Sequence, residues 1–81
     1  MIFIILAYIF ERVYNINCSP GDDSDTIQNT KEKCKNNMQC IGVYQKTCND
    51  YEDAYECLKT QTSSSHVQVE GCLYRKITIG M

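Results

Sequence analysis

Six cysteines in a chain of only 81 residues constrain this sequence more than any other feature. An even number of cysteines in a short chain is typical of a disulfide framework that forms in an oxidising compartment. A core of this size rarely contributes more than about 3–5 kcal/mol of net stability, whereas each disulfide adds about 2–4 kcal/mol. We therefore expect one small domain held by disulfides among Cys18, Cys34, Cys40, Cys48, Cys57 and Cys72.

The spacing of the cysteines argues against a metal centre. Zinc sites usually contain closely paired ligands such as C-x2-C, and the nearest pair here, Cys34 and Cys40, has five residues between its members. His66, the sole histidine, lies in a polar loop that is unsuited to hold catalytic geometry. No nucleophile, base and orienting group occur together. We therefore predict no metal, no cofactor and no enzymatic activity.

The N-terminus carries an apolar run, MIFIILAYIF, over residues 1–10. The run is about half the roughly 20 residues that a membrane span requires, and it matches the core of a signal peptide. No Lys or Arg precedes it and no A-x-A site follows, but Val13 and Asn15 can occupy positions −3 and −1 of a cleavage site. We predict a signal peptide over residues 1–15, a secreted domain over 16–81, and no membrane span in the mature chain. The alternative is an N-terminal strand or helix that is buried in the fold.

The first part of the expected domain combines an irregular segment with a helix. Residues 15–25 are rich in Ser, Pro, Gly and Asp, which favour turns, and Cys18 anchors them. Ser24 or Asp25 is expected to cap a helix that continues to about Asn36. One stripe of this helix faces the core and contains Ile27, Thr30 and Cys34.

After the helix the apolar period changes to that of strands. Alternation predicts strands over residues 40–45, 54–58 and 72–79, with further strand residues at Val67 and Val69. In the first of these strands, Cys40, Gly42 and Tyr44 are expected on one face. Residues 60–66 are expected to form a polar loop, and Cys48 falls in a loop as well. The order of elements predicts an α+β fold, with one helix packed on a small antiparallel sheet.

The motif C-KNNMQ-C-IGVY, which begins at Cys34, and the later segments Cys57-Leu58-Lys59 and Cys72-Leu73-Tyr74-Arg75-Lys76 resemble PAN/apple domains, especially small divergent invertebrate members. The resemblance covers about two thirds of the chain. It implies a helix cradled by a curved antiparallel sheet in a secreted domain that binds proteins or carbohydrates. The chain departs from many apple domains in having Thr30 where they carry a second helix cysteine, so their disulfide pairing does not transfer.

Six cysteines allow 15 pairings. We expect a nested set, because it would tie the lead-in to the last strand and the helix to the sheet. Its three disulfides are Cys18–Cys72, Cys34–Cys57 and Cys40–Cys48. The main alternative contains a local disulfide between Cys34 and Cys40.

Candidate binding residues surround an acidic turn. Tyrosine is favoured at binding surfaces for its rigid, amphipathic area, and the acidic turn is expected at the surface rather than as a calcium site, because the EF-hand spacing is absent. Tyr44 and Tyr74 are expected to pack within the sheet. The predicted contact residues are Asp50, Tyr51, Glu52, Asp53 and Tyr55. Asn17 begins the N-x-S sequon Asn17-Cys18-Ser19 and is a candidate glycosylation site.

Two classes of function are consistent with these features. The net charge of −2, without a basic patch, argues against nucleic acid as a partner. We predict a non-catalytic, secreted recognition module whose partner is an extracellular protein or glycan. The alternative is a free-standing effector, such as a toxin-like or protease-inhibitory cysteine-rich peptide.

Overall fold

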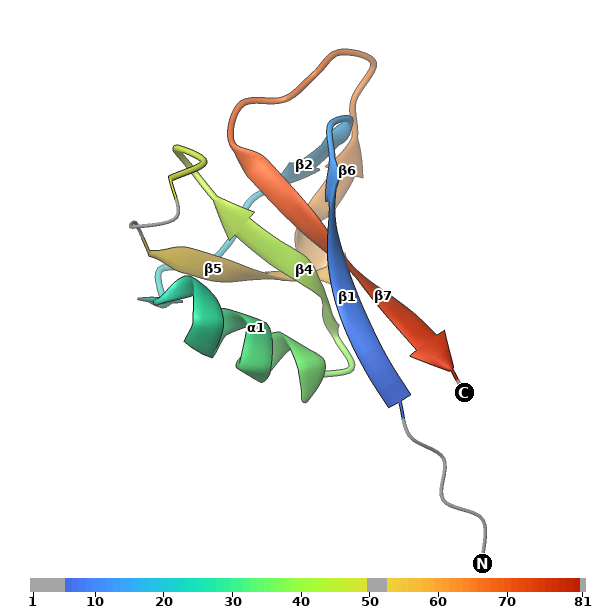
Figure 1. Cartoon of the computed structure of the whole chain (residues 1–81). Helices are drawn as coiled ribbons and strands as arrows, with labels where there is room; N and C mark the ends of the chain where they lie inside the picture. The colour runs from blue at the N-terminus through green and yellow to red at the C-terminus, as the bar shows by residue number, and fades with distance from the viewer. Residues whose placement is uncertain (1–5, 50–52, 81) are drawn as a thin grey trace, which may run out of the picture.

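The computed structural model describes residues 6–49 and 53–80. Figure 1 shows the longer helix lying against a twisted sheet. In chain order the elements are β1 (Leu6–Val13), β2 (Ile16–Cys18), β3 (Ser24–Asp25), α1 (Ile27–Lys35), β4 (Cys40–Gln45), β5 (Ala54–Leu58), the short helix η1 (Lys59–Gln61), β6 (Thr62–Ser64) and β7 (Cys72–Gly80). In this part of the chain no helix has the length and apolar composition that a membrane crossing requires.

The strands form two sheets, and α1 packs against the larger one. The main sheet has the order β1-β7-β4-β5-β3, all of its pairs are antiparallel, and β2 and β6 form a second, two-stranded sheet. One core cluster lies between α1 and the main sheet, and a second contains side chains of β2, β5 and β7. The predicted α+β class, a helix packed on a small antiparallel sheet with disulfides, is confirmed.

The helix begins one or two residues later than the sequence indicated. Thr26, and not Ser24 or Asp25, is the N-cap, and its hydroxyl accepts a hydrogen bond from the backbone N–H of Asn29 at 3.2 Å. Asp25 adds a second acceptor, because its carboxylate accepts from the Thr26 N–H at 2.7 Å. The predicted core stripe is confirmed, since Thr30 and Cys34 are buried and Ile27 packs against the first cluster.

A β-bulge in β4 overturns the predicted face pattern of residues 40–45. The register shifts between Cys40 and Gly42, so that Ile41 is the extra residue. Cys40 consequently packs with Val43 in the cluster under the helix, whereas Ile41 packs against the second cluster together with Tyr44. Cys40 therefore does not share a face with Tyr44.

Two segments that were predicted as irregular contain strands. β2 begins in the lead-in and β6 lies in the serine-rich segment, and they pair through Ile16 with Ser64 and Cys18 with Thr62. The local sequence did not indicate either strand. The composition around them is polar, and each pairs with a segment that is distant in sequence. The predicted strand residues Val67 and Val69 instead lie in the loop between β6 and β7.

The nested disulfide pairing is wrong, although all six cysteines do form disulfides. The observed disulfides are Cys18–Cys57, Cys34–Cys40 and Cys48–Cys72. The bulge turns Cys40 toward the end of α1, where Cys34 lies. Cys57 points to the opposite face of the sheet, where β2 carries Cys18. Cys48 follows β4 closely, and β4 ends opposite the first residue of β7, because Gln45 pairs with Cys72.

The first described strand comes from the predicted signal peptide. β1 pairs with β7 over eight positions, from Leu6 opposite Gly80 to Val13 opposite Leu73. Phe10 packs against the cluster under the helix and Val13 packs against the second cluster. In the structure these residues form an edge strand whose described side chains are half-buried or exposed, so the alternative is met in its strand but not in its burial; removal of residues 1–15 stays a prediction.

Candidate functional site

A cavity of about 230 Å³ lies between the helix, β5 and the segment that leads into β3. Its lining combines carboxylates, an ammonium group, a hydroxyl, an amide and one aliphatic side chain. The lining residues are Gly21, Asp23, Asp25, Thr30, Lys33, Glu56, Leu58 and Gln61. Polar groups in a ligand pocket fix the orientation of the ligand by hydrogen bonds, and this cavity has several of them.

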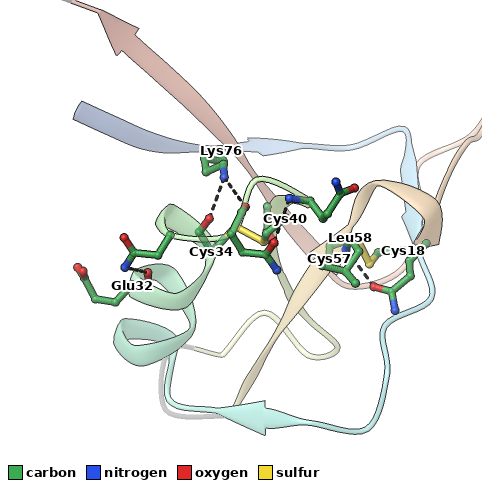
Figure 2. Close-up of a disulfide and its surroundings, with 12 residues drawn as sticks. Cys18, Glu32, Cys34, Cys40, Cys57, Leu58 and Lys76 are labelled. Atoms are coloured by element: carbon green, nitrogen blue, oxygen red, sulfur yellow. Dashed lines mark hydrogen bonds between the residues drawn. A yellow bond between two sulfur atoms is a disulfide. The ribbon is translucent and has the colours of Figure 1, made fainter. Parts of the chain in front are cut away.

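Disulfides hold two walls of the cavity. The helix that carries Thr30 and Lys33 is tied to β4 by Cys34–Cys40, and β5 is tied to β2 by Cys18–Cys57. Figure 2 shows both disulfides on either side of the strand that carries Leu58. Because these walls are fixed before a ligand arrives, little conformational entropy would be lost on binding.

An ion pair forms one side of the cavity. The Lys33 ammonium donates a hydrogen bond to the Asp25 carboxylate at 2.9 Å. This bond, together with those from the Thr26 N–H and the Asn29 side chain, lowers the pKa of Asp25 from 3.8 to about 2. The hydrogen bond to Asp25 in turn raises the pKa of Lys33 above its usual value. Asp25 is therefore ionised at physiological pH and engaged with residues of its own chain.

The remaining charges make the cavity acidic. Asp23, Asp25 and Glu56 contribute three carboxylates against the one ammonium group of Lys33. In the part of the chain that the structure describes, no group of three or more acidic, histidine or cysteine side chains is arranged to hold a metal ion. The field of the cavity therefore favours a neutral polar or a cationic ligand and disfavours an anionic one.

Hydrogen bonds within the cavity determine which polar atoms face a ligand. The Thr30 hydroxyl lies 2.8 Å from the carbonyl oxygen of Thr26, to which it donates. The side-chain oxygen of Gln61 accepts from the backbone N–H of Leu58 at 2.9 Å, which holds the amide in place. Because its oxygen is engaged in this bond, the donor that the Gln61 amide can offer to a ligand is its NH₂ group.

The predicted contact residues that the structure describes, Asp53 and Tyr55, do not line this cavity. Asp50, Tyr51 and Glu52 lie outside the described residues. Asp53 is exposed and accepts a hydrogen bond from the Ser24 hydroxyl at 3.3 Å. Tyr55 is half-buried on β5.

Tyr55 points to the opposite face of the sheet, because it alternates along β5 with Glu56 and Leu58. Its ring lies 5.2 Å from the Lys46 ammonium. Directly across the ladder is Tyr44, which packs against the second core cluster as the sequence predicted. Tyr55 and Lys46 form a separate small surface.

The two other residues that the sequence singled out are exposed. Asn17 lies on β2 opposite Ser63 and is exposed, and its glycosylation stays a prediction. His66 lies in the loop after β6 and is exposed. Neither residue lines the cavity.

Sequence reasoning missed the cavity residues. The sequence predicts Asp23 as part of an irregular lead-in and Asp25 as part of that lead-in or as a helix cap, with no indication of a ligand site at either residue. Glu56 and Gln61 had no local signal at all, because the fold alone brings them beside the helix. Comparison of the chain with models of known protein families, with curated proteins and with solved structures finds no match.

Proposed function

We propose that this protein is a secreted, non-catalytic recognition module of PAN/apple type that binds an extracellular protein or glycan. Residues 1–15 serve as its signal peptide and are removed. Three disulfides in a small domain are typical of extracellular proteins, which supports secretion. The motifs around Cys34, Cys57 and Cys72 support the family.

One observation carries the proposal: the polar cavity is preformed and two of its walls are tied down by disulfides. A rigid site of mixed donors and acceptors suits repeated binding of one kind of ligand. The ligand contacts assigned to the cavity are the carboxylates of Asp23 and Glu56 and the amide of Gln61. Leu58 supplies the apolar surface.

The charge of the cavity limits the classes of ligand that it can bind. Carboxylate and amide groups hydrogen-bond the hydroxyl groups of a neutral sugar, and the excess of carboxylates attracts an amino or guanidinium group of a protein. Sulfated or phosphorylated glycans are disfavoured, because Asp23, Asp25 and Glu56 would repel them.

The test uses the secreted protein on an array of glycans and on an array of purified extracellular proteins. Asp23→Asn and Glu56→Gln are expected to weaken binding at least about tenfold, since each removes a charged acceptor. Glu70→Gln is the matched control, because Glu70 is exposed in the loop before β7. Tyr55→Ala separates the cavity from the surface that the sequence favoured.

The outcomes are distinct. Binding that Asp23→Asn and Glu56→Gln weaken assigns the ligand to the cavity. Binding that only Tyr55→Ala weakens contradicts the cavity and favours the turn surface. Two blank arrays contradict the recognition module altogether, and inhibition of a panel of proteases would then favour the effector peptide.

A further inference from the structure

Strand β7 has two halves with different neighbours. From Cys72 to Arg75 it pairs with β4 on one side, whereas its outer half beyond Arg75 has a strand partner only in β1, among the described residues. In Figure 1, β1 and β7 extend beyond the rest of the sheet as a two-stranded arm. The edge of β7 that β1 covers is therefore the longest strand-binding edge in this fold.

β1 inserts side chains on both faces of the sheet. Phe10 packs against the core cluster between α1 and the main sheet. The Lys31 ammonium lies 5.7 Å from the centre of the Phe10 ring. Val13 packs on the opposite face with the second core cluster. Between them, Glu11 stands directly opposite Arg75 in the ladder, and opposite charges at such positions favour strand pairing. β1 thus fills a site with defined side-chain requirements.

Residues 6–13, which form β1, also lie within the predicted signal peptide. They cannot be both removed during export and kept as a strand of the fold. Signal peptides are removed during export, and removal after Asn15 deletes all of β1. The mature chain then keeps β7 with an open edge, and the surfaces that Phe10 and Val13 cover become accessible. An open, partly apolar strand edge is a template for another strand.

We propose that the open edge of β7 in the mature chain binds an extended strand of a partner protein in the place that β1 occupies. This inference rests on the proposed secretion and cleavage. It adds a second binding site, at the edge of the main sheet opposite to the β3 edge. The contacts that β1 makes indicate which residue types the partner strand needs. The partner strand has an aromatic residue, an acidic residue next to it, and a branched aliphatic residue three positions after the aromatic one.

The backbone and the side chains divide the work of recognition. Main-chain hydrogen bonds along β7 provide affinity without regard to sequence. Selectivity comes from the aromatic residue that packs near Lys31, the acidic residue opposite Arg75, and the aliphatic residue that packs near Leu73.

The experiment begins with the whole chain, expressed in a secretory host. The intact mass of the secreted product determines whether residues 6–13 are still present. The product is then titrated with a labelled synthetic peptide of residues 6–14, LAYIFERVY, and binding is followed by fluorescence anisotropy. A peptide of scrambled order is the control.

The expected result is a product that lacks β1 and binds the peptide saturably. Phe10→Ala in the peptide weakens binding at least about tenfold, and Glu11→Arg weakens it by about two- to fivefold. Arg75→Glu in the protein restores binding of the Glu11→Arg peptide, because the charge pair is re-formed in reverse. Arg75 is exposed, so its replacement leaves the core intact.

Three results overturn the inference, and they are distinguishable. A secreted product that retains residues 6–13 shows that β1 is a permanent strand. A cleaved product that does not bind the peptide, or that binds the scrambled peptide equally well, refutes the strand site and leaves the cavity proposal standing. Absence of the protein from the medium refutes secretion and with it both proposals.

Discussion

The ammonium group of Lys76, on β7, donates a hydrogen bond of 2.8 Å to the carbonyl oxygen of Cys34 in the last turn of α1. A second hydrogen bond of 3.0 Å reaches the carbonyl oxygen of Asn37, just after the helix. Figure 2 shows both bonds leading from the Lys76 nitrogen to two separate oxygens at the helix end. The last carbonyl groups of a helix lack partners within it and carry partial negative charge, so a cation there stabilises the helix and joins it to the sheet.

Replacement of this lysine is expected to destabilise the domain. Lys76→Met keeps most of the aliphatic side chain and removes both donors, so the expected loss is about 1–3 kcal/mol of unfolding free energy. Urea unfolding of the purified protein measures it. Lys59→Met, at an exposed position in η1, is the control and is expected to change stability by less than about 0.5 kcal/mol. Equal losses in the two variants would contradict the role of Lys76.

Gly42 is expected to tolerate no side chain. A Cβ at this position would lie 2.5 Å from the carbonyl oxygen of Tyr74 on the neighbouring strand. That atom is backbone, so it cannot move aside cheaply, and Gly42→Ala should cost about 1–3 kcal/mol. Gly21→Ala is the matched control, because no heavy atom lies within 4 Å of its added Cβ. Thermal unfolding of the pair checks the prediction, and an unchanged melting temperature in Gly42→Ala would refute it.

The disulfide pairing is open to direct mapping. Digestion with trypsin and a glutamate-specific protease, without reduction, separates Cys48 from Cys57 because Glu52 and Glu56 lie between them. Mass spectrometry is expected to recover Cys18 linked to Cys57, and Cys48 linked to Cys72. Recovery of a Cys18–Cys72 peptide would instead restore the nested arrangement.

The disulfides should contribute unequally to stability. Cys18–Cys57 spans 39 residues and Cys34–Cys40 spans only 6, so the longer loop restricts the unfolded chain more. The loop-entropy model predicts losses of about 4 kcal/mol and about 2 kcal/mol when each pair is replaced by alanines. Denaturant unfolding of the two double variants tests the order. The reverse order would show that native packing outweighs loop entropy here.

Acid is expected to weaken the contact between Asp25 and Lys33. The folded pKa of Asp25, about 2, lies below its ordinary 3.8, so this carboxylate stabilises the fold above about pH 4 and the contribution disappears as the pH falls toward 2. The stability difference between the native chain and Asp25→Asn should therefore be largest near pH 6 and vanish near pH 2. Added salt should reduce it, because the pair is exposed. A difference that is independent of pH would contradict the prediction.

Local patterns in the sequence predicted much of this fold. The stripe of Ile27, Thr30 and Cys34 identified the inner face of α1, because helical spacing is a property of neighbouring residues. Alternation identified β4 and β5 with the observed bounds and β7 within one residue. The number of cysteines in so short a chain was sufficient to predict disulfides.

Tertiary structure alone decided which cysteines pair and where a ligand can lie. The bulge at Ile41 reverses the direction of Cys40, and it depends on a ladder between strands that no local pattern encodes. The pairing of β1 with β7 and the placement of Glu56 beside Lys33 likewise join segments far apart in the chain. Residue type and spacing therefore determined α1, β4, β5 and β7, whereas contacts between distant segments determined the other strands, the disulfide pairing and the cavity.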